Sequence, residues 1–282
     1  MSSVPAERAA YWRVDGLGLE AMGARFHHFA YPTHSHDTYA FGVTDQGAQS
    51  FLCRGERATS AQGHVMAFNP DDPHDGYAAA DGGYRYRMLH IPEHLVRDVL
   101  ADTAGARAGL PLFSRPVVND PALARTLVRL HRAIVDREPR LVVDERLTAA
   151  VIGMTGHATA GPARRAQEHG RAGTAATRAR ALLEERFTEN VGADELAAAA
   201  GCSRYALYRG FHAAYGLAPS DYQRDLRLRR ARSLLAAGLA PSAAAASAGF
   251  ADQAHLSRWF TRTYGIPPGA YHRADGTPRP PP

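Results

Sequence analysis

Two helix-turn-helix patterns follow one another in the last part of the chain, at residues 193–211 and 241–260. In each, a short helix is followed by a glycine, a polar residue and a second helix with Leu and Phe four positions apart. Gly201 and Gly249 suit the backbone of a tight turn between helices, and Ser203 and Asp252 suit N-caps. Two such units in tandem predict an all-helical DNA-binding domain.

The second helix of each unit is expected to bury one stripe of apolar side chains. Leu207 and Phe211 lie one turn apart, as do Leu256 and Phe260, so each pair faces the same side. The opposite face then presents its polar side chains to solvent or to DNA.

We expect seven helices in this domain, beginning with residues 175–187 and ending with residues 268–273. A long helix over residues 219–236 separates the two helix-turn-helix units. Its expected buried side chains are Tyr222, Leu226, Ala231, Leu234 and Leu235. A long helix of this kind is suited to hold two recognition helices at a set distance.

The charge distribution also favours nucleic-acid binding by the C-terminal part. The chain has a formal net charge of +5, and all 33 of its basic residues are arginine. Residues 1–159 contain 16 Arg and 18 acidic residues, whereas residues 174–276 contain 13 Arg and 9 acidic residues. The excess of arginine therefore lies in the region of the helix-turn-helix patterns, where it would attract the phosphates of DNA.

Cysteine content and hydrophobicity bear on the compartment. Cys53 and Cys202 are the only cysteines and fall in different predicted domains, so a disulfide framework is not expected. The chain starts without an apolar signal sequence, and no segment approaches the roughly 20 apolar residues of a membrane span. We expect a cytoplasmic protein with no membrane partner.

The N-terminal part has the pattern of a β domain followed by helices. From about residue 23 to residue 91, short alternating or apolar runs are separated by Gly, Asp and Pro turns, which predicts a small antiparallel barrel or sandwich. Helical periodicity follows over residues 121–135 and 143–158. Residues 161–173 are expected to form a flexible linker, and residues 275–282 a disordered tail.

The C-terminal region resembles the DNA-binding domain of AraC/XylS-type bacterial transcriptional regulators, and residues 249–273 are close to that family's signature. The N-terminal region more loosely resembles the cupin-like effector-binding and dimerisation domain of many members. That second resemblance is carried by His34, His36, Gly47, the turn at residues 63–70 and His74. Together they imply an α+β protein: a cupin-like antiparallel β-barrel with following helices at 1–160, a linker at 161–173, a double helix-turn-helix domain at 174–274 and a tail at 275–282.

By this resemblance, the protein senses a small molecule and binds double-stranded promoter DNA through two recognition helices. The candidate DNA-binding residues are Ser203, Arg204, Tyr205, Tyr208 and Arg209 in the first unit and His255, Ser257 and Arg258 in the second. Trp259 is assigned to the core or its edge. Two helices in one rigid domain can enter successive major grooves, and Arg209 and Arg258 can contact either a guanine or a phosphate.

Three interpretations of His34, His36 and His74 stay open. Their spacing matches that of metal-dependent cupins, although Ala40 stands where those proteins carry an acidic ligand. A site of three imidazoles can still bind zinc. Alternatively, the histidines contact the effector, or they hold loops by hydrogen bonds. Metal binding is the least favoured of the three, and no cofactor is expected.

The effector is expected to bind in a concave, mostly apolar site with a few polar groups. The candidate effector-binding residues are His34, His36, Tyr39, His74, Tyr84, Tyr86 and Met88. Tyr84, Tyr86, Met88 and His90 share one face of a strand and Arg85 and Arg87 the other, but the sequence does not tell which face is inside.

The expected partners are promoter DNA, an unidentified effector and a second copy of the chain. The helices at 121–158 are the expected dimer surface; the alternative is that they only cap the barrel. RNA polymerase is a candidate partner, and DNA binding would place the protein on the bacterial nucleoid. We expect no enzymatic activity. The alternative is a metal-dependent cupin enzyme fused to a DNA-binding module. Alkyl transfer through a four-cysteine zinc centre is excluded because the chain has only 2 cysteines.

Overall fold

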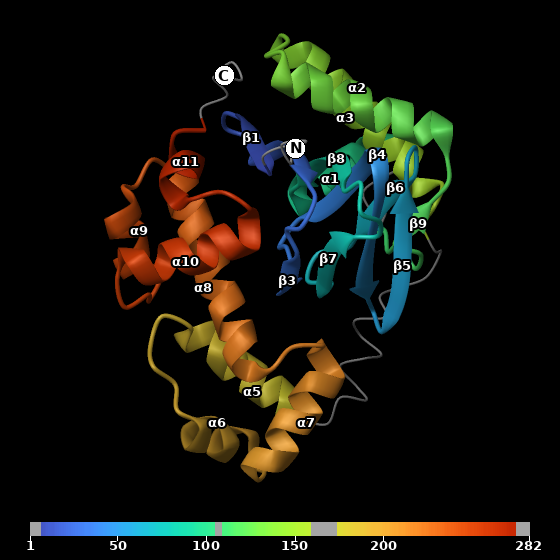
Figure 1. Cartoon of the computed structure of the whole chain (residues 1–282). Helices are drawn as coiled ribbons and strands as arrows, with labels where there is room; N and C mark the ends of the chain where they lie inside the picture. The colour runs from blue at the N-terminus through green and yellow to red at the C-terminus, as the bar shows by residue number, and fades with distance from the viewer. Residues whose placement is uncertain (1–6, 105–108, 159–173, 275–282) are drawn as a thin grey trace. The chain divides into compact units, whose positions relative to one another are not determined.

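The computed structural model describes residues 7–104, 109–158 and 174–274, which form two compact units (Figure 1). The first unit is an antiparallel β domain with helices, and the second is all-helical, so the expected α+β fold class is confirmed. The linker and the tail expected at 161–173 and 275–282 lie outside the described residues. Among the helices of the described ranges, none is both long and apolar enough to cross a membrane.

The β domain contains strands that begin earlier than the sequence pattern suggests. The strands are β1 (Arg8–Val14), β2 (Leu19–Phe26), β3 (Tyr31–His34), β4 (Tyr39–Cys53), β5 (Glu56–Ala61), β6 (Val65–Phe68), β7 (His74–Ala78), β8 (Tyr84–Ile91) and β9 (Val117–Val118). The expected start of the β region near residue 23 is therefore wrong. Both β1 and β2 contain Ala or Gly, which have low strand propensity. Pairing decides their conformation, because β1 pairs with β2 and β2 pairs with β8.

The strands pair in two groups that share β4. One group follows the order β1-β2-β8-β4-β6-β9, and in the other β7 pairs with both β3 and β4 while β5 pairs with β4. Every pairing among these strands is antiparallel. The long strand β4 serves both groups, because its first half pairs with β6 and its second half pairs with β5 and β7.

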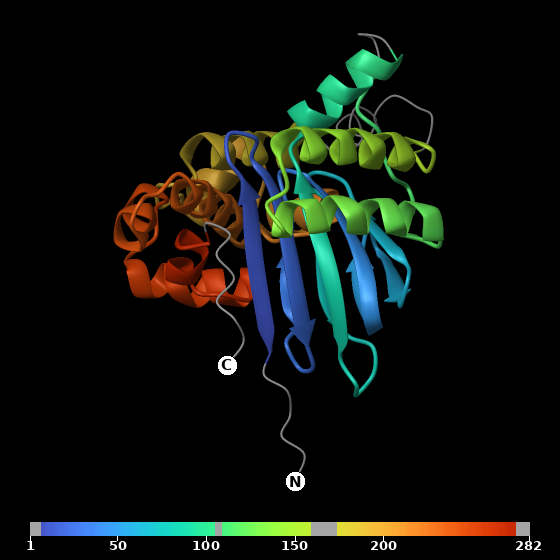
Figure 2. The same ribbon diagram turned by 90° about the horizontal axis from the view of Figure 1, so that it is seen from above.

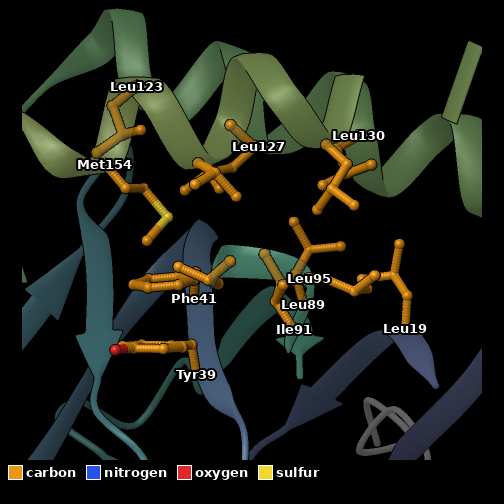
Figure 3. Close-up of a cluster of buried hydrophobic side chains, with 14 of the residues drawn as sticks. Leu19, Tyr39, Phe41, Leu89, Ile91, Leu95, Leu123, Leu127, Leu130 and Met154 are labelled. Atoms are coloured by element: carbon orange, nitrogen blue, oxygen red, sulfur yellow. The ribbon is translucent and has the colours of Figure 1, made fainter. Parts of the chain in front are cut away.

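The described part of the β domain contains three helices: α1 (Glu93–Ala104), α2 (Pro121–Val135) and α3 (Arg140–Thr155). Figure 2 shows α2 and α3 side by side over one face of the sheet. Their side chains Leu127 and Met154 point toward Phe41 and Leu89 of the strands, and all four are buried (Figure 3). This apolar layer fixes the two helices on one face of the sheet. The opposite face of the sheet points into the interior of the β domain.

Helix α2 has the predicted bounds, whereas α3 is shifted toward the N-terminus from the expected 143–158. The helix begins directly after Pro139, but its first buried side chain is Val143. The apolar periodicity is visible in the sequence only from that residue, so the prediction missed the first turn.

His131 of α2 provides a pH-dependent contribution to stability. It is buried against the sheet, and its Nε2 donates to the carbonyl oxygen of Met22 at 3.0 Å. Burial lowers the pKa of His131 from 6.5 to about 4. Between these pH values the unfolded chain binds a proton at His131 that the folded chain does not. Its contribution is therefore complete above pH 6.5 and is lost as the pH falls toward 4.

Acidification from pH 7 to pH 5 should therefore lower the free energy of unfolding by about 2 kcal/mol through His131. Urea denaturation of the wild type and of His131→Leu at both pH values measures this, and the variant should lose about 2 kcal/mol less than the wild type. His94→Gln, at an exposed position of α1, is the control and should behave like the wild type. An equal acid loss in the wild type and in His131→Leu would contradict the assignment.

Over residues 174–272, the second unit contains the seven expected helices. They are α5 (Thr174–Arg186), α6 (Ala193–Ala200), α7 (Arg204–Tyr215), α8 (Pro219–Ala236), α9 (Pro241–Ser247), α10 (Gln253–Tyr264) and α11 (Pro268–His272). The long helix α8 has the predicted bounds and contacts α5 and α7 on one side and α9, α10 and α11 on the other. The two helix-turn-helix units therefore share α8 as a common support (Figure 1).

The buried side of α8 differs in part from the prediction. Tyr222, Ala231 and Leu235 are buried as expected, but Leu226 and Leu234 are only half-buried. Leu228, Asp225 and Arg232 are buried instead. Because α8 packs against helices on several sides, its contacts do not follow one stripe. The guanidinium of Arg232 lies 5.4 Å from the ring centre of Tyr264, and its Nε donates to Tyr271 Oη at 3.2 Å.

The two turns follow the sequence prediction. Gly201 and Gly249 have φ values of 69° and 81°, in the left-handed region that favours glycine. Ser203 Oγ accepts a hydrogen bond from the Ala206 amide at 3.3 Å, and Asp252 Oδ1 accepts one from the His255 amide at 2.6 Å. These N-caps begin α7 and α10, the two second helices of the units.

The loop after α5 connects the two halves of this unit. From α8, Arg227 Nε donates to the Phe187 carbonyl at 2.6 Å, and Gln223 Nε2 donates to the Glu189 carbonyl at 2.8 Å. On the other side, Gly249 lies so close that a Cβ there would be 2.5 Å from Thr188 O. The α5 loop thus holds both the shared helix and the second turn.

Candidate effector site and DNA-binding surface

His34, His36 and His74 come together inside the β domain. Strands β3 and β7 pair with His34 opposite His74, and His36 follows β3. All three side chains are buried, and one ring nitrogen of each lies within 4.8 Å of the other two. The ring centres of His34 and His74 are 4.6 Å apart, and that of His36 lies 4.9 Å from His34. The structure therefore forms a compact cluster of imidazoles, which we call the histidine cluster.

Two imidazoles of the histidine cluster are oriented by the backbone in the same way. His34 Nδ1 lies 2.8 Å from the Pro32 carbonyl, and His74 Nδ1 lies 2.8 Å from the Asp72 carbonyl. Since a carbonyl only accepts, each Nδ1 carries the proton and donates it. The lone pair of each ring is then on Nε2. Both bonds reach two residues back along the chain, so local geometry sets the orientation.

A polar network holds the loop before His74. The carboxylate of Asp72 accepts from the Asn69 backbone amide at 2.9 Å and from Asn69 Nδ2 at 2.8 Å, and it pairs with Arg54 at 2.5 Å. Asn69 Oδ1 also accepts from the Phe113 amide at 2.9 Å. These bonds fix the backbone whose carbonyl orients His74. The turn at Asn69 therefore supports the site from outside.

The imidazole of His74 is neutral at ordinary pH. It is buried and stacks on Phe68 with ring centres 3.9 Å apart. Burial, together with neighbouring His34, lowers the pKa of His74 well below 6.5. Neutral imidazole can act as a hydrogen-bond donor, an acceptor or a ligand atom, so the cluster is suited to bind a small polar partner.

Strand β8 contributes three more of the predicted effector residues, Tyr84, Tyr86 and Met88. Tyr84, Tyr86, Met88 and His90 are buried and alternate with Leu89 and Ile91, which pack under the helices. The first four therefore face the domain interior. There, the His90 ring centre lies 4.7 Å from that of His36.

The tyrosines of the interior are linked to one another. Tyr86 Oη donates to Tyr31 Oη at 2.9 Å, and the ring centres of Tyr84 and Tyr86 are 5.5 Å apart. Burial raises the pKa of Tyr31, Tyr84 and Tyr86, so each keeps its hydroxyl proton. Tyr31 was not predicted as a site residue, because its short strand carries no clear alternation; the adjoining histidines were the only signal.

Tyr39 does not lie with the other predicted effector residues. It sits on the helix-covered face of the sheet beside Phe41, and its Oη donates to the Pro111 carbonyl at 2.8 Å (Figure 3). Arg85 and Arg87 also lie away from the interior and pair with Asp45, at 3.3 Å and 2.9 Å. Tyr39 therefore lies apart from the histidine cluster, at a small apolar cavity that it lines with Phe41 and Phe113, and neither arginine faces the cluster.

Helix α7 exposes most of the residues predicted to contact DNA. Tyr205 and Tyr208 are 73% and 45% exposed, unusually high for large aromatic side chains. The Arg209 guanidinium lies 5.6 Å from the centre of the Tyr205 ring. Arg204 pairs with Asp194 at the surface, and Ser203 caps the helix. The opposite face buries Leu207 and Phe211 as expected.

Helix α10 has a similar division. Arg258 is exposed, Ser257 and His255 are half-buried, and the His255 ring contacts Phe250 at 5.4 Å. Leu256 and Phe260 are buried, and Trp259 lies at the edge with its ring centre 3.7 Å from the Arg224 guanidinium. Gln253, at the N-terminus of α10, is also exposed. Gln253 was not among the predicted DNA-binding residues, although its place directly after the N-cap was a usable signal.

Comparison with protein families gives a match for each unit. Residues 16–151 match the model of the AraC-like ligand binding domain, and residues 196–274 match that of a helix-turn-helix domain. The two matches fall on the β domain with its helices and on the helical unit, respectively.

Similar proteins carry regulator names. The chain is 27% identical to the HTH-type transcriptional regulator YbfI of Bacillus subtilis over 226 residues, covering 80% of this chain and 81% of that protein. It is 37% identical to the HTH-type transcriptional regulator GbdR of Pseudomonas aeruginosa over 89 residues, covering 31% of this chain and 24% of GbdR.

Solved structures of ToxT from Vibrio cholerae share the two-domain fold. One has a TM-score of 0.55 at 13% identity and covers 95% of this chain and 98% of ToxT. A second, with unsaturated fatty acid bound, has a TM-score of 0.55 at 12% identity and covers 96% of each chain. At these identities the likeness shows the fold.

Proposed function

We propose that this chain is a transcriptional regulator of the AraC family, with a ligand-binding domain followed by a helix-turn-helix DNA-binding domain. In this proposal, α7 and α10 enter successive major grooves of promoter DNA. The observation that carries this proposal is the pair of capped helices supported by one helix, α8, each with a buried apolar face and an exposed polar face. A shared rigid support suits simultaneous contact with one face of the duplex.

We further propose which side chains read the DNA. On α7, Tyr205, Tyr208 and Arg209 are exposed together, and the ring of Tyr205 beside Arg209 limits the orientations of the guanidinium. On α10, Arg258 and the overlooked Gln253 are exposed. Arginine can bind guanine with two hydrogen bonds, and glutamine can bind adenine in the same way. Ser203, Arg204, His255 and Ser257 are proposed as backbone or secondary contacts.

The spacing of the two contacted DNA segments tests this proposal. Full-length protein should protect two segments about one helical turn apart for each protomer. Inserting about five base pairs between them turns one segment to the opposite face, and affinity should fall on the order of 100-fold, which corresponds to losing one helix's share of specific binding. Footprinting and gel-shift titration measure both effects.

The rigid support makes a second insertion informative. About ten added base pairs restore the helical phase but move the segments roughly 34 Å further apart, which α8 cannot span, so affinity should stay low. The same insertions placed outside the site are the control and should have no effect. Recovery of binding with ten base pairs would contradict a fixed pair of recognition helices.

For the effector, we propose a small molecule bound in the interior of the β domain among His36, His90, Tyr86 and Met88. The solved ToxT structure with unsaturated fatty acid supports a ligand role for this fold. Here, however, imidazoles and phenols line the interior beside Met22 and Met88. These groups favour a ligand with hydrogen-bonding or metal-ligating atoms over a plain hydrocarbon. We propose sensing rather than catalysis, in keeping with relatives named as transcriptional regulators.

We also propose that the protein forms a homodimer through α3. Leu141 and Ile152 are 79% and 46% exposed on this helix, which leaves apolar surface that a second copy can cover. Light scattering at micromolar concentration should give the mass of a dimer, and Leu141→Glu with Ile152→Glu should give a monomer. Leu52→Glu, at an exposed apolar position of β4, is the matched control and should stay dimeric. A monomeric wild type would overturn the proposal.

A further inference from the structure

The histidine cluster has the composition of a transition-metal site. Its three members lie 5–8% exposed, and the ligand atoms that they offer are within 4.8 Å of one another. Burying three polar rings costs free energy unless strong interactions compensate for it, and apolar side chains would fill the same space at lower cost. A shared ligand is therefore a better explanation of the cluster than packing alone.

The orientation of the rings supports the same conclusion. In metal sites, a ligating histidine usually donates its other ring N–H to a carbonyl or carboxylate, which fixes the tautomer and the ring plane. His34 and His74 each make this bond to a backbone carbonyl at 2.8 Å. The hydrogen bonds from Arg54 and Asn69 to Asp72 hold the carbonyl that serves His74. The supporting shell of a metal site is thus present around two of the three rings.

The ligand type limits the choice of ion. The cluster offers imidazole nitrogens only, which suit zinc, cobalt, nickel and copper, whereas calcium and magnesium prefer oxygen ligands. Nitrogens at about 2.0–2.1 Å from a tetrahedral zinc ion lie roughly 3.4 Å apart, so modest rotations of the rings would bring these atoms into range. Three imidazoles leave a fourth position for water or for a donor atom of an effector.

We propose that His34, His36 and His74 bind one divalent transition-metal ion of the zinc type inside the ligand-binding domain. The binding of the ion follows from the cluster itself; only its role in sensing rests on the proposed regulatory function. The site would make the ion, or a small molecule bound at its fourth position, the signal that the domain detects.

Cobalt provides a direct probe. Full-length protein without a polyhistidine tag, stripped with a chelator, should bind one equivalent of Co²⁺ and develop the visible absorption of a tetrahedral or five-coordinate site. Added Zn²⁺ should remove that absorption by displacement. His36→Gln and His74→Gln should each weaken binding by more than about 100-fold, because loss of a ligand exceeds the 10- to 100-fold cost of losing an outer partner.

The control is His94→Gln, which removes an exposed imidazole of α1 and should bind cobalt like the wild type. Circular dichroism of the stripped variants checks their folding, and Zn²⁺ should raise the Tm of the wild type and of His94→Gln but not of the cluster variants. Failure of the stripped wild type to take up one equivalent of cobalt would overturn the proposal, whatever the variants do.

Promoter binding separates this inference from the proposed function. If the stripped protein takes up no ion but protects two DNA segments, the metal site is wrong and the regulator stands. If it binds one ion but prefers no promoter sequence, the metal site stands and the DNA-binding proposal is wrong.

Discussion

Replacing Gly249 by alanine should lower the free energy of unfolding of the helical unit by more than about 3 kcal/mol. Its left-handed backbone, with φ of 81°, costs a residue with a Cβ about 1–2 kcal/mol. The new Cβ would also lie 2.5 Å from Thr188 O and 2.6 Å from Thr188 Cα. Because these are backbone atoms held by α8, they cannot move aside without breaking the hydrogen bonds of that loop.

Gly201 supplies a matched comparison in the first helix-turn-helix unit. Its backbone is also left-handed, but its added Cβ would meet only the end of the Arg178 side chain, at 3.0 Å. Gly201→Ala should therefore cost only about 1–2 kcal/mol. Gly210 lies inside α7, and an added Cβ would meet no atom within 4 Å beyond the backbone of its own helix. Gly210→Ala should therefore stabilise the helical unit by up to about 1 kcal/mol.

Urea denaturation followed by the fluorescence of Trp259, which lies in the helical unit, and by circular dichroism measures these differences. Trp12 in the β domain reports the other unit, so Trp12→Phe variants isolate the signal. If Gly249→Ala lowered the free energy of unfolding no more than Gly201→Ala does, the Thr188 backbone would move freely. The two helix-turn-helix units would then not be tightly connected.

Removing both Arg209 and Arg258 should nearly abolish promoter recognition. Each bidentate contact with a base contributes about 1–3 kcal/mol of discrimination, and the two residues lie in separate helix-turn-helix units, so their losses should add. The double variant Arg209→Ala with Arg258→Ala is therefore expected to lose about 2–6 kcal/mol, or from roughly 30-fold to 10⁴-fold in affinity for its operator.

Salt dependence and conservative replacement identify the type of contact. A base contact relaxes preference at one base pair, whereas a phosphate contact weakens binding to all sequences and reduces the salt slope by about one. Arg258→Lys keeps the charge but loses the two-pronged geometry, so it should fail at a guanine and largely survive at a phosphate. Arg97→Ala, at an exposed position of α1, is the control for general charge loss. Unchanged operator affinity of the double variant would contradict α7 and α10 as recognition helices.

The helical unit was predictable because its signals are local. Gly201, Ser203, Gly249 and Asp252 set turns and caps through their own backbone and side chains, and the spacing of Leu and Phe sets the buried stripes. The buried side of α8 was not predictable in the same way. It packs on several helices, so burial of Asp225 and Arg232 depends on partners far away in the sequence.

The β domain depends more on distant pairing. The alternation on β8 identifies two faces, but only the position of α2 and α3 tells which face lies inside. For the same reason, Tyr39 was grouped with the histidines in the sequence and lies on the other side of the sheet in the structure. The three histidines themselves were predicted as a group, because their spacing along the chain matches that of metal-dependent cupins, and the structure brings them together.

The loop that Arg227, Gln223 and Gly249 hold in place has a consequence for genes rather than for the protein. Mutations that change base pairs within a binding site can be compensated by new side chains on α7 or α10. The number of base pairs between the two contacted segments cannot be compensated in this way, because no single substitution changes the separation of α7 and α10. Promoters that this protein controls should therefore differ in base sequence while the spacing between their two contacted segments stays constant.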